Sequence, residues 1–415
     1  MSFTKSTKSP RRWRHRRISA AIAIVCSIAL IAAACGDDDD DDTTPEAPAA
    51  TTAAPASPAA TEAPSTTAAP AALAAPESPA ATTAAPATMA PTTTEAPVEQ
   101  MMDPTSVGLV FDLGGRGDLS FNDAAAAGLD RAIEDFELDA QEASPNDDGS
   151  NREAILQLQA DRAELVLGIG FLFADSLAKV AADNPDTSFA IIDGFIAEAT
   201  PNIVMLLFAE HEGSFLVGAA AALKSQTGTI GYIGGVNIPT LNRFEAGYIA
   251  GARAVNPDIE ILSQYLSEPP DFSGFGDPAS AQVLAQSFYE QGADVIYHAA
   301  GGSGNGLFAA AKEFSETEGS KVWAIGVDSD QYLTSDESVR PYILTSMLKR
   351  VDVAVYQSIN AVVDGSFEGG IRTFSLVDDG VGYSTSGGFV DDIADQLEDY
   401  KQQIIDGDIV VPATL

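Results

Sequence analysis

Short apolar runs alternate with alanine-rich helical stretches from Thr105 onward, and this alternation restricts the possible folds more than any other feature of the chain. The runs cover residues 107–112, 138–143, 165–170, 189–193, 203–208, 230–234, 259–266, 295–300, 322–328 and 343–348. Most are continuously apolar, as expected of strands buried on both faces of a parallel sheet. Helical patterns lie between them at residues 122–136, 151–161, 175–184, 210–224, 242–255, 278–291 and 304–315. This order predicts an α/β fold with parallel sheets.

Ten such strands could form one large sheet or two smaller ones. A glycine-rich stretch near the middle of the folded part, GTIGYIGG at residues 228–235, restarts the strand–helix–strand pattern. We therefore expect two similar, doubly wound parallel-sheet lobes. A closed eight-stranded barrel is the alternative.

The N-terminal segment has the three parts of a bacterial secretion signal. Residues 1–17 are basic, residues 18–34 are apolar, and Cys35 follows three alanines. This pattern predicts a signal peptide over residues 1–34. The cysteine directly after small residues resembles a lipobox, which makes Cys35 the expected lipid attachment site. An uncleaved membrane helix would be short at about 17 residues, and an ordinary signal peptide with an incidental cysteine is the other alternative.

Residues 36–102 contain no Lys or Arg and consist almost only of Asp, Thr, Pro, Ala, Ser and Glu. Such a composition cannot bury enough apolar surface to fold. We expect residues 35–102 to be a lipidated cysteine followed by a disordered tether. Residues 103–415 would then form the two-lobed ligand-binding domain.

Charge and cysteine content exclude several classes of function. The chain has 22 basic and 60 acidic side chains, and seven of the basic ones lie in residues 1–34, which leaves a net charge of −45 beyond that segment. A surface of this sign repels nucleic acid and anionic lipid. The two cysteines are Cys26 and Cys35, so the folded part has no disulfide, thiolate metal site or cysteine nucleophile. No catalytic constellation, metal cluster or cofactor motif is present, and we expect a protein without enzymatic activity.

Aromatic, carboxylate and amide side chains recur where the predicted strands end. In open parallel sheets, ligands lie beyond the carboxyl ends of the strands. Aromatic faces stack on flat rings, and carboxylates accept hydrogen bonds from vicinal hydroxyls, so this set favours a neutral ligand with a flat ring and several hydroxyls. Ser120 could instead cap the helix that follows it. The candidate ligand-binding residues are Asp112, Ser120, Phe121, Asn122, Asp193, Phe275, Gly302, Asp328 and Lys349.

Nine motifs in order resemble the basic membrane protein family, the lipoprotein substrate-binding components of purine nucleoside ABC importers. The resemblance covers residues 105–415. Its motifs are Asp112-x-Gly-Gly-x-x-Asp118-x-Ser120-Phe121-Asn122, Gly168-Ile-Gly-Phe171 with Asp175, Phe189-Ala-Ile-Ile-Asp193, Glu212-Gly-Ser-Phe215-Leu-Val-Gly218, Gly234-Gly235 with Arg243-Phe244-x-x-Gly247-Tyr-x-x-Gly251, Phe275-x-Asp277-Pro278, Ala300-Gly301-Gly302-x-Gly304-x-Gly306, Gly326-Val-Asp328-Ser-Asp330-Gln331 and Ser346-Met-Leu-Lys349-Arg350.

The resemblance implies a type I periplasmic-binding-protein fold with a hinge, and an ABC permease as partner. It also implies roles for the candidate residues. Phe121 and Phe275 would face the two sides of a purine base. Asp112, Asn122 and Asp193 would lie near the base edge, with Asp175 competing with Asp193 for one role. Gly302, Asp328 and Lys349 would bind the ribose.

The chain departs from the family pattern at residues 116–119, where Arg-Gly-Asp-Leu replaces a stretch of the Ile-Asp-Asp-Lys type. The choice of ligand within the family is therefore open. A sugar or another polyol on the same scaffold is one alternative, and a sensor subunit is a second. A tethered hydrolase would need a nucleophile–base pair or a metal cluster, and the sequence offers neither. The expected location is the extracytoplasmic face of the cell membrane, with the membrane contacted only through the lipid.

Overall fold

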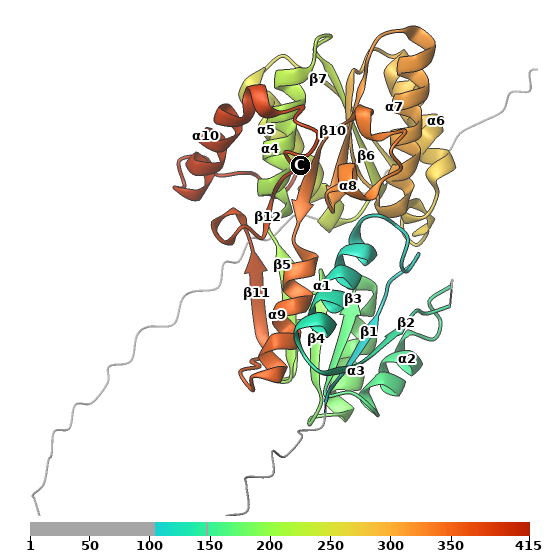
Figure 1. Cartoon of the computed structure of the whole chain (residues 1–415), viewed down its shortest axis with the longest axis vertical. Helices are drawn as coiled ribbons and strands as arrows, with labels where there is room; N and C mark the ends of the chain where they lie inside the picture. Colours follow the sequence, from blue (N-terminus) through green and yellow to red (C-terminus); the bar gives the residue numbers. More distant parts are fainter. Residues whose placement is uncertain (1–103, 147) are drawn as a thin grey trace, which may run out of the picture. The chain divides into compact units, whose positions relative to one another are not determined.

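The computed structural model describes residues 104–146 and 148–415, and these fold into two α/β lobes, each built on a six-stranded sheet (Figure 1). The predicted signal peptide, Cys35 and the predicted tether lie outside the described residues. None of the described helices combines the length and the apolar character that a bilayer crossing requires.

The first lobe contains a sheet whose strands are all parallel. Their spatial order is β11 (Gly370–Phe374), β5 (Ile203–Phe208), β4 (Ser188–Ile192), β3 (Leu165–Ile169), β1 (Thr105–Val110) and β2 (Leu138–Ala143). One face carries α2 (Arg152–Ala160) and α3 (Ala174–Asp183), while the other carries α1 (Phe121–Asp135) and α9 (Val351–Val363). Because helices cover both faces, the central strands are apolar throughout, as in the fully buried LVLGI of β3.

The second lobe repeats this plan with one antiparallel edge strand. Its order is β12 (Val381–Tyr383), β10 (Ile343–Lys349), β9 (Trp323–Asp328), β8 (Val295–Ala299), β6 (Thr229–Val236) and β7 (Glu260–Ser267), and only β12 runs antiparallel to its neighbour. The longer helices packed on this lobe are α4 (Glu210–Lys224), α5 (Pro239–Val255), α6 (Pro278–Glu290), α7 (Gly304–Glu318) and α10 (Ala394–Ile405).

Short helical turns connect these elements, and several of them face the cleft between the lobes. They are η1 (Phe171–Phe173), η2 (Ser273–Phe275), η3 (Gly301–Ser303), α8 (Gln331–Thr334), η4 (Arg340–Tyr342), η5 (Leu376–Asp378) and η6 (Asp391–Ile393).

The chain passes between the lobes three times within the described residues. It crosses at Ala209 between β5 and α4, at Arg350 between β10 and α9, and at Ser375 between β11 and η5. Three neighbouring crossings, visible at the waist of Figure 1, form the connection at which the two lobes can rotate relative to each other.

The structure confirms the predicted fold class and rules out the barrel alternative, since both sheets are open. Each predicted strand and helix is present within three residues at either end. The sequence reasoning did not identify α9, β11, β12 or α10. After Arg350 the chain forms α9 and β11 in the first lobe and then returns to the second lobe, where it forms β12 and α10.

Candidate ligand-binding cleft

A pocket lies between the two lobes, at the carboxyl ends of strands from both sheets. The empty space among its residues is about 720 Å³, part of it open to solvent. The lining residues are Asp112, Leu113, Asp118, Phe121, Asn122, Gly170, Phe171, Leu172, Asp193, Thr240, Leu241, Phe244, Phe275, Ala299, Ala300, Gly301, Gly302, Val327, Asp328 and Lys349.

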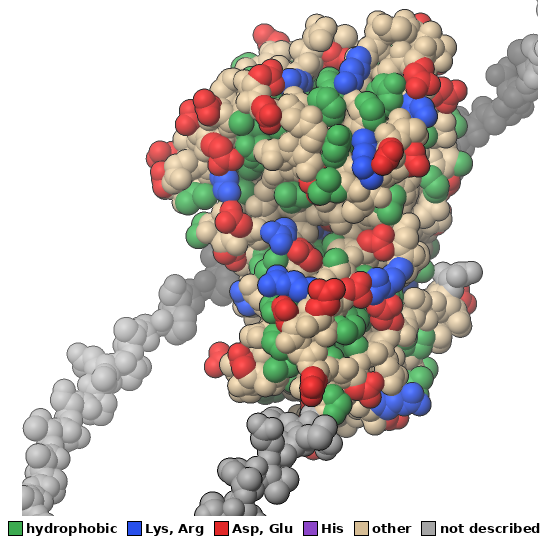
Figure 2. Space-filling view, in the orientation of Figure 1, with side chains coloured by type: hydrophobic (Ala, Val, Ile, Leu, Met, Phe, Trp, Pro, Cys, Tyr) green, Lys and Arg blue, Asp and Glu red, His purple; other side chains and the backbone are tan. Residues whose placement is uncertain are grey.

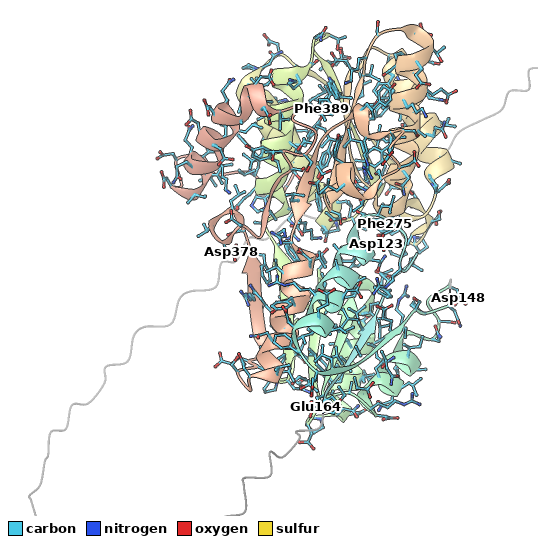
Figure 3. All side chains as sticks on the ribbon, viewed as in Figure 1. Asp123, Asp148, Glu164, Phe275, Asp378 and Phe389 are labelled. Carbon is cyan, nitrogen blue, oxygen red and sulfur yellow. The ribbon has the colours of Figure 1, made fainter. Side chains whose placement is uncertain are left out.

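Aromatic rings enter the pocket from both lobes. Phe121 is the first residue of α1 and Phe171 begins η1, both in the first lobe, whereas Phe275 ends η2 in the second. The rings of Phe171 and Phe272 approach across the cleft with centroids 5.9 Å apart. Figure 3 labels Phe275 in the second lobe and Asp123 in the first, on the two sides of the cleft. Asp123 lies in the first turn of α1. The pocket therefore offers apolar faces on opposite walls.

One end of the pocket holds Asp112 and Asn122. The Asn122 side chain accepts a hydrogen bond from the Asp112 backbone N–H at 3.1 Å and donates to the Leu113 carbonyl at 3.3 Å and to Asp118 at 3.1 Å. These contacts fix the loop that carries Asp112. Burial raises the pKa of the Asp112 carboxyl to about 6, against the opposing effects of the Leu113 N–H and Arg152.

Lys349 lies at another part of the pocket, where β10 ends. Its Nζ pairs with Asp193 and sits 4.9 Å from the centre of the Phe121 ring and 5.5 Å from that of Phe244. Burial alone would lower the pKa of Lys349, but the surrounding carboxylates Asp193, Asp328 and Glu210 outweigh burial and raise it. The amine is therefore charged at neutral pH and held between aromatic faces.

Two further carboxyl groups near Lys349 are buried. Burial raises the pKa of Asp328 to about 6, opposed first by Lys349 and then by a hydrogen bond from Ser120. Burial also raises the pKa of Glu210, the first residue of α4, to about 7, opposed first by Lys349. Arg243 pairs with Glu210 at 3.2 Å. The pKa values of Asp328 and Glu210 therefore both lie close to neutral pH. Glu210 directly follows the crossing at Ala209.

Two of the four non-glycine residues with positive φ among the described residues line the pocket, namely Asp193 at 58° and Asp328 at 63°. A third, Leu119 at 57°, accepts a hydrogen bond from Gln331 of the other lobe. Left-handed backbone at such residues costs free energy and concentrates at functional sites. At the ends of β4 and β9, this backbone turn directs the Asp193 and Asp328 side chains into the pocket.

Eight of the nine predicted ligand-binding residues line this pocket, and Ser120 does not. Ser120 is fully buried and makes no side-chain cap to α1. Its Oγ donates instead to Asp328 Oδ2 at 2.6 Å, from the first lobe to the second. Ser329 Oγ donates back to the Ser120 carbonyl at 3.1 Å, and Gln331 donates to the Leu119 carbonyl at 3.0 Å. Ser120 is thus a contact between the lobes, and it orients Asp328.

The structure pairs the carboxylate of Asp193, which the resemblance places near the base edge with Asp112 and Asn122, with Lys349. Asp175 is not among the lining residues. The sequence reasoning missed Thr240 and Leu241 in the first turn of α5, because it followed strand ends only.

The sequence reasoning also missed Arg152 and Glu210, which do not line the pocket but interact electrostatically with the lining residues Asp112 and Lys349, respectively.

No group of three or more potential metal ligands occurs in the part of the chain that the structure describes. On the face drawn in Figure 2, acidic and basic side chains are mixed along the boundary between the lobes.

Two sheets joined by neighbouring crossings, with a pocket between their carboxyl ends, define the class of two-lobed solute-binding proteins. A solved structure from Aeropyrum pernix K1, an ABC transporter system solute-binding protein, has this fold. It is 34% identical with a TM-score of 0.66, and the match covers 74% of this chain and 94% of that one. This agreement confirms the predicted periplasmic-binding-protein type of fold.

The family model described as "ABC transporter substrate-binding protein PnrA-like" matches residues 105–414. A Listeria monocytogenes protein named "CD4+ T-cell-stimulating antigen" is 38% identical over 323 residues, which cover 74% of this chain and 88% of that protein. The Lactococcus lactis "ABC transporter nucleoside-binding protein BmpA" is 35% identical over 320 residues, with the same coverage of 74% and 88%. The chain therefore belongs to the Bmp family of ABC transporter substrate-binding proteins, as its motifs predicted. Membership implies a small-molecule ligand and a membrane permease as partners.

Proposed function

We propose that this protein is the lipid-anchored, extracytoplasmic substrate-binding component of an ABC importer and that it binds a purine nucleoside in the cleft. The observation that carries the proposal is the composition of the pocket. Aromatic rings lie on opposite walls, and charged groups lie where the edge of a base and a ribose would reach. A relative at 35% identity bears the name of a nucleoside-binding protein.

The base would lie between Phe121 and Phe275. These residues come from different lobes, so a bound base would hold the lobes together. Base–aromatic stacking contributes about 1–3 kcal/mol per base.

The ribose would lie near Lys349 and Asp328. A lysine ammonium has three N–H donors, and Asp193 takes one of them, which leaves donors for sugar oxygens. Asp328 would accept from a ribose hydroxyl while Ser120 holds its other side. A charged, partly desolvated hydrogen bond of this kind contributes roughly 1.5–3 kcal/mol.

The remaining parts of the proposal concern location. A lipid on Cys35 would hold the protein at the outer face of the membrane, and the acidic surface would keep the folded part from binding anionic lipid directly. The protein would deliver its ligand to a permease without transforming it.

Thermal unfolding of the purified full-length chain with and without ligand tests this function. Inosine, guanosine or adenosine at a hundredfold excess over its dissociation constant should stabilise the protein by about 2.7 kcal/mol. Ribose and glucose are the controls and should have little effect. A clear shift with a sugar and none with any purine nucleoside would assign the site to the sugar alternative.

A further inference from the structure

Arg152 lies behind the end of the pocket that holds Asp112 and is not itself a lining residue. It is the first residue of α2, and its side chain is only 15% exposed. One guanidinium nitrogen lies 3.7 Å from Asp112 Oδ1, and another donates to the Gly149 carbonyl at 3.4 Å. Gly149 has φ of 65°, and a Cβ there would come within 1.9 Å of the guanidinium. The absence of a side chain at Gly149 therefore leaves the space that the Arg152 guanidinium occupies next to Asp112.

The Asp112 carboxylate presents one oxygen to the pocket. Oδ1 accepts from the Leu113 N–H at 2.8 Å and faces Arg152. No donor among the described residues hydrogen-bonds to Oδ2. Gly170 lies beside Oδ2 with φ of 110°, and a Cβ at this position would sit 2.2 Å from it. Asp112 Oδ2 is thus a hydrogen-bond acceptor without a donor among the described residues. The space beside it is open because Gly170 has no side chain.

We propose that Arg152 is a positioning residue that keeps Asp112 in its carboxylate form, so that at neutral pH the cleft prefers 6-oxopurine over 6-aminopurine nucleosides. This inference rests on the proposed function. The reason lies in the edge of the base. Inosine and guanosine carry a hydrogen on N1, which an ionised carboxylate can accept. Adenosine has a bare N1, so a carboxyl oxygen that faces N1 must carry a proton to bind it, and the 6-amino group beside N1 is the only donor on that edge.

The protonation state of Asp112 should therefore determine whether the cleft prefers inosine or adenosine. Burial brings its pKa to about 6, within reach of mild acid. The Asp112 carboxyl group faces Arg152 from α2 and is linked to Asp118 through Asn122, and Arg152 also interacts electrostatically with Asp148. Across the pocket the charged lining residues are Asp193, Asp328 and Lys349.

Asp328 and Glu210 titrate in the same range as Asp112, so the pH dependence of a single affinity would be ambiguous. Inosine and adenosine carry the same ribose. Effects of the Lys349 cluster on ribose binding cancel in the ratio of their two dissociation constants. That ratio reports the base edge alone.

The experiment measures both dissociation constants by titration calorimetry on the purified full-length chain across pH. In the proposed contact at N1, each nucleoside binds only one protonation state of Asp112, and its apparent dissociation constant scales with the population of that state. With a pKa of about 6, acidification from about pH 7 to about pH 5 should weaken inosine about tenfold and strengthen adenosine about tenfold. The ratio should change about a hundredfold.

Two variants of Arg152 separate its charge from its packing. Arg152→Met removes the charge and should move the midpoint of the ratio upward by about 1–3 pH units, the usual effect of an adjacent arginine on a carboxyl pKa. Arg152→Lys keeps the charge and should leave the midpoint near that of the natural protein. Asp112→Asn should make the ratio independent of pH. Thermal melts of each variant verify that it is folded.

A ratio that stays constant with pH in the natural protein, while both nucleosides bind, overturns the inference and leaves the proposed function standing. An Arg152→Met midpoint equal to that of Arg152→Lys also overturns it. Absence of binding by either nucleoside at any pH would instead contradict the proposed function.

Discussion

The stacking role of Phe275 can be tested by removing its ring. Phe275 ends η2 in the second lobe, is only partly buried, and lines the pocket. Phe275→Ala removes one stacking face, so nucleoside binding should weaken by about 1–3 kcal/mol, or about 5- to 150-fold. Phe121→Ala should do the same from the opposite wall. Because both rings face the cleft, the ligand-free protein should lose less stability than a core variant would.

Phe173 is the matched control. It lies in the same η1 turn as the lining residue Phe171, but it is fully buried against the apolar face of α2 and α3. Phe173→Ala should cost about 3–5 kcal/mol of stability through cavity formation. The assay combines calorimetric titration with inosine and urea unfolding without ligand. If the Phe121 and Phe275 variants were as unstable as the Phe173 variant and bound inosine unchanged per folded molecule, the stacking assignment would be wrong.

Three further perturbations address the charged cluster and the anchor. Lys349→Met leaves Asp193 without its partner in a buried site and should lower the free energy of unfolding by about 3–5 kcal/mol, measured in urea. Asp328 has a folded pKa of about 6, above the usual 3.8. Its neutral form is therefore favoured on folding, and its contribution to ligand-free stability is present below about pH 4 and lost as pH rises through about 6, on the order of 3 kcal/mol. Asp328→Asn should remove that dependence, and an unchanged pH profile of unfolding would contradict the assignment. Cys35→Ala should release the protein from the membrane fraction or leave it unprocessed; a variant that is still lipidated would refute the lipobox interpretation.

Most of the framework could be predicted because buried parallel strands leave a direct trace in sequence. The continuous apolar runs at β3 and β4 are typical of strands that are buried on both faces in an α/β fold. The elements that follow Arg350 have a weaker pattern in the sequence. α9 contains five valines and reads as a strand by composition, yet it packs as a helix against α1. β11 is mostly exposed and β12 has only three residues, so neither produces an apolar run.

The candidate site could likewise be predicted only in part from the sequence. The rule that ligands lie at strand ends was enough to select residues such as Asp112, Asp328 and Lys349, which the fold brings into one pocket. It could not show the direction of a side chain, and Ser120 turned out to point at Asp328. Nor could it find Arg152, because this residue meets Asp112 only once α2 packs beside β1.

The central claim, a purine nucleoside in the cleft, is tested most directly by native mass spectrometry of the full-length chain purified from its own cells. The account predicts a bound species heavier than the free protein by the mass of one purine nucleoside, lost on dialysis and restored by added inosine. The same species should be absent from a variant carrying both Phe121→Ala and Phe275→Ala. A retained hexose or pentose, displaced by sugar and unaffected by nucleoside, would contradict the account.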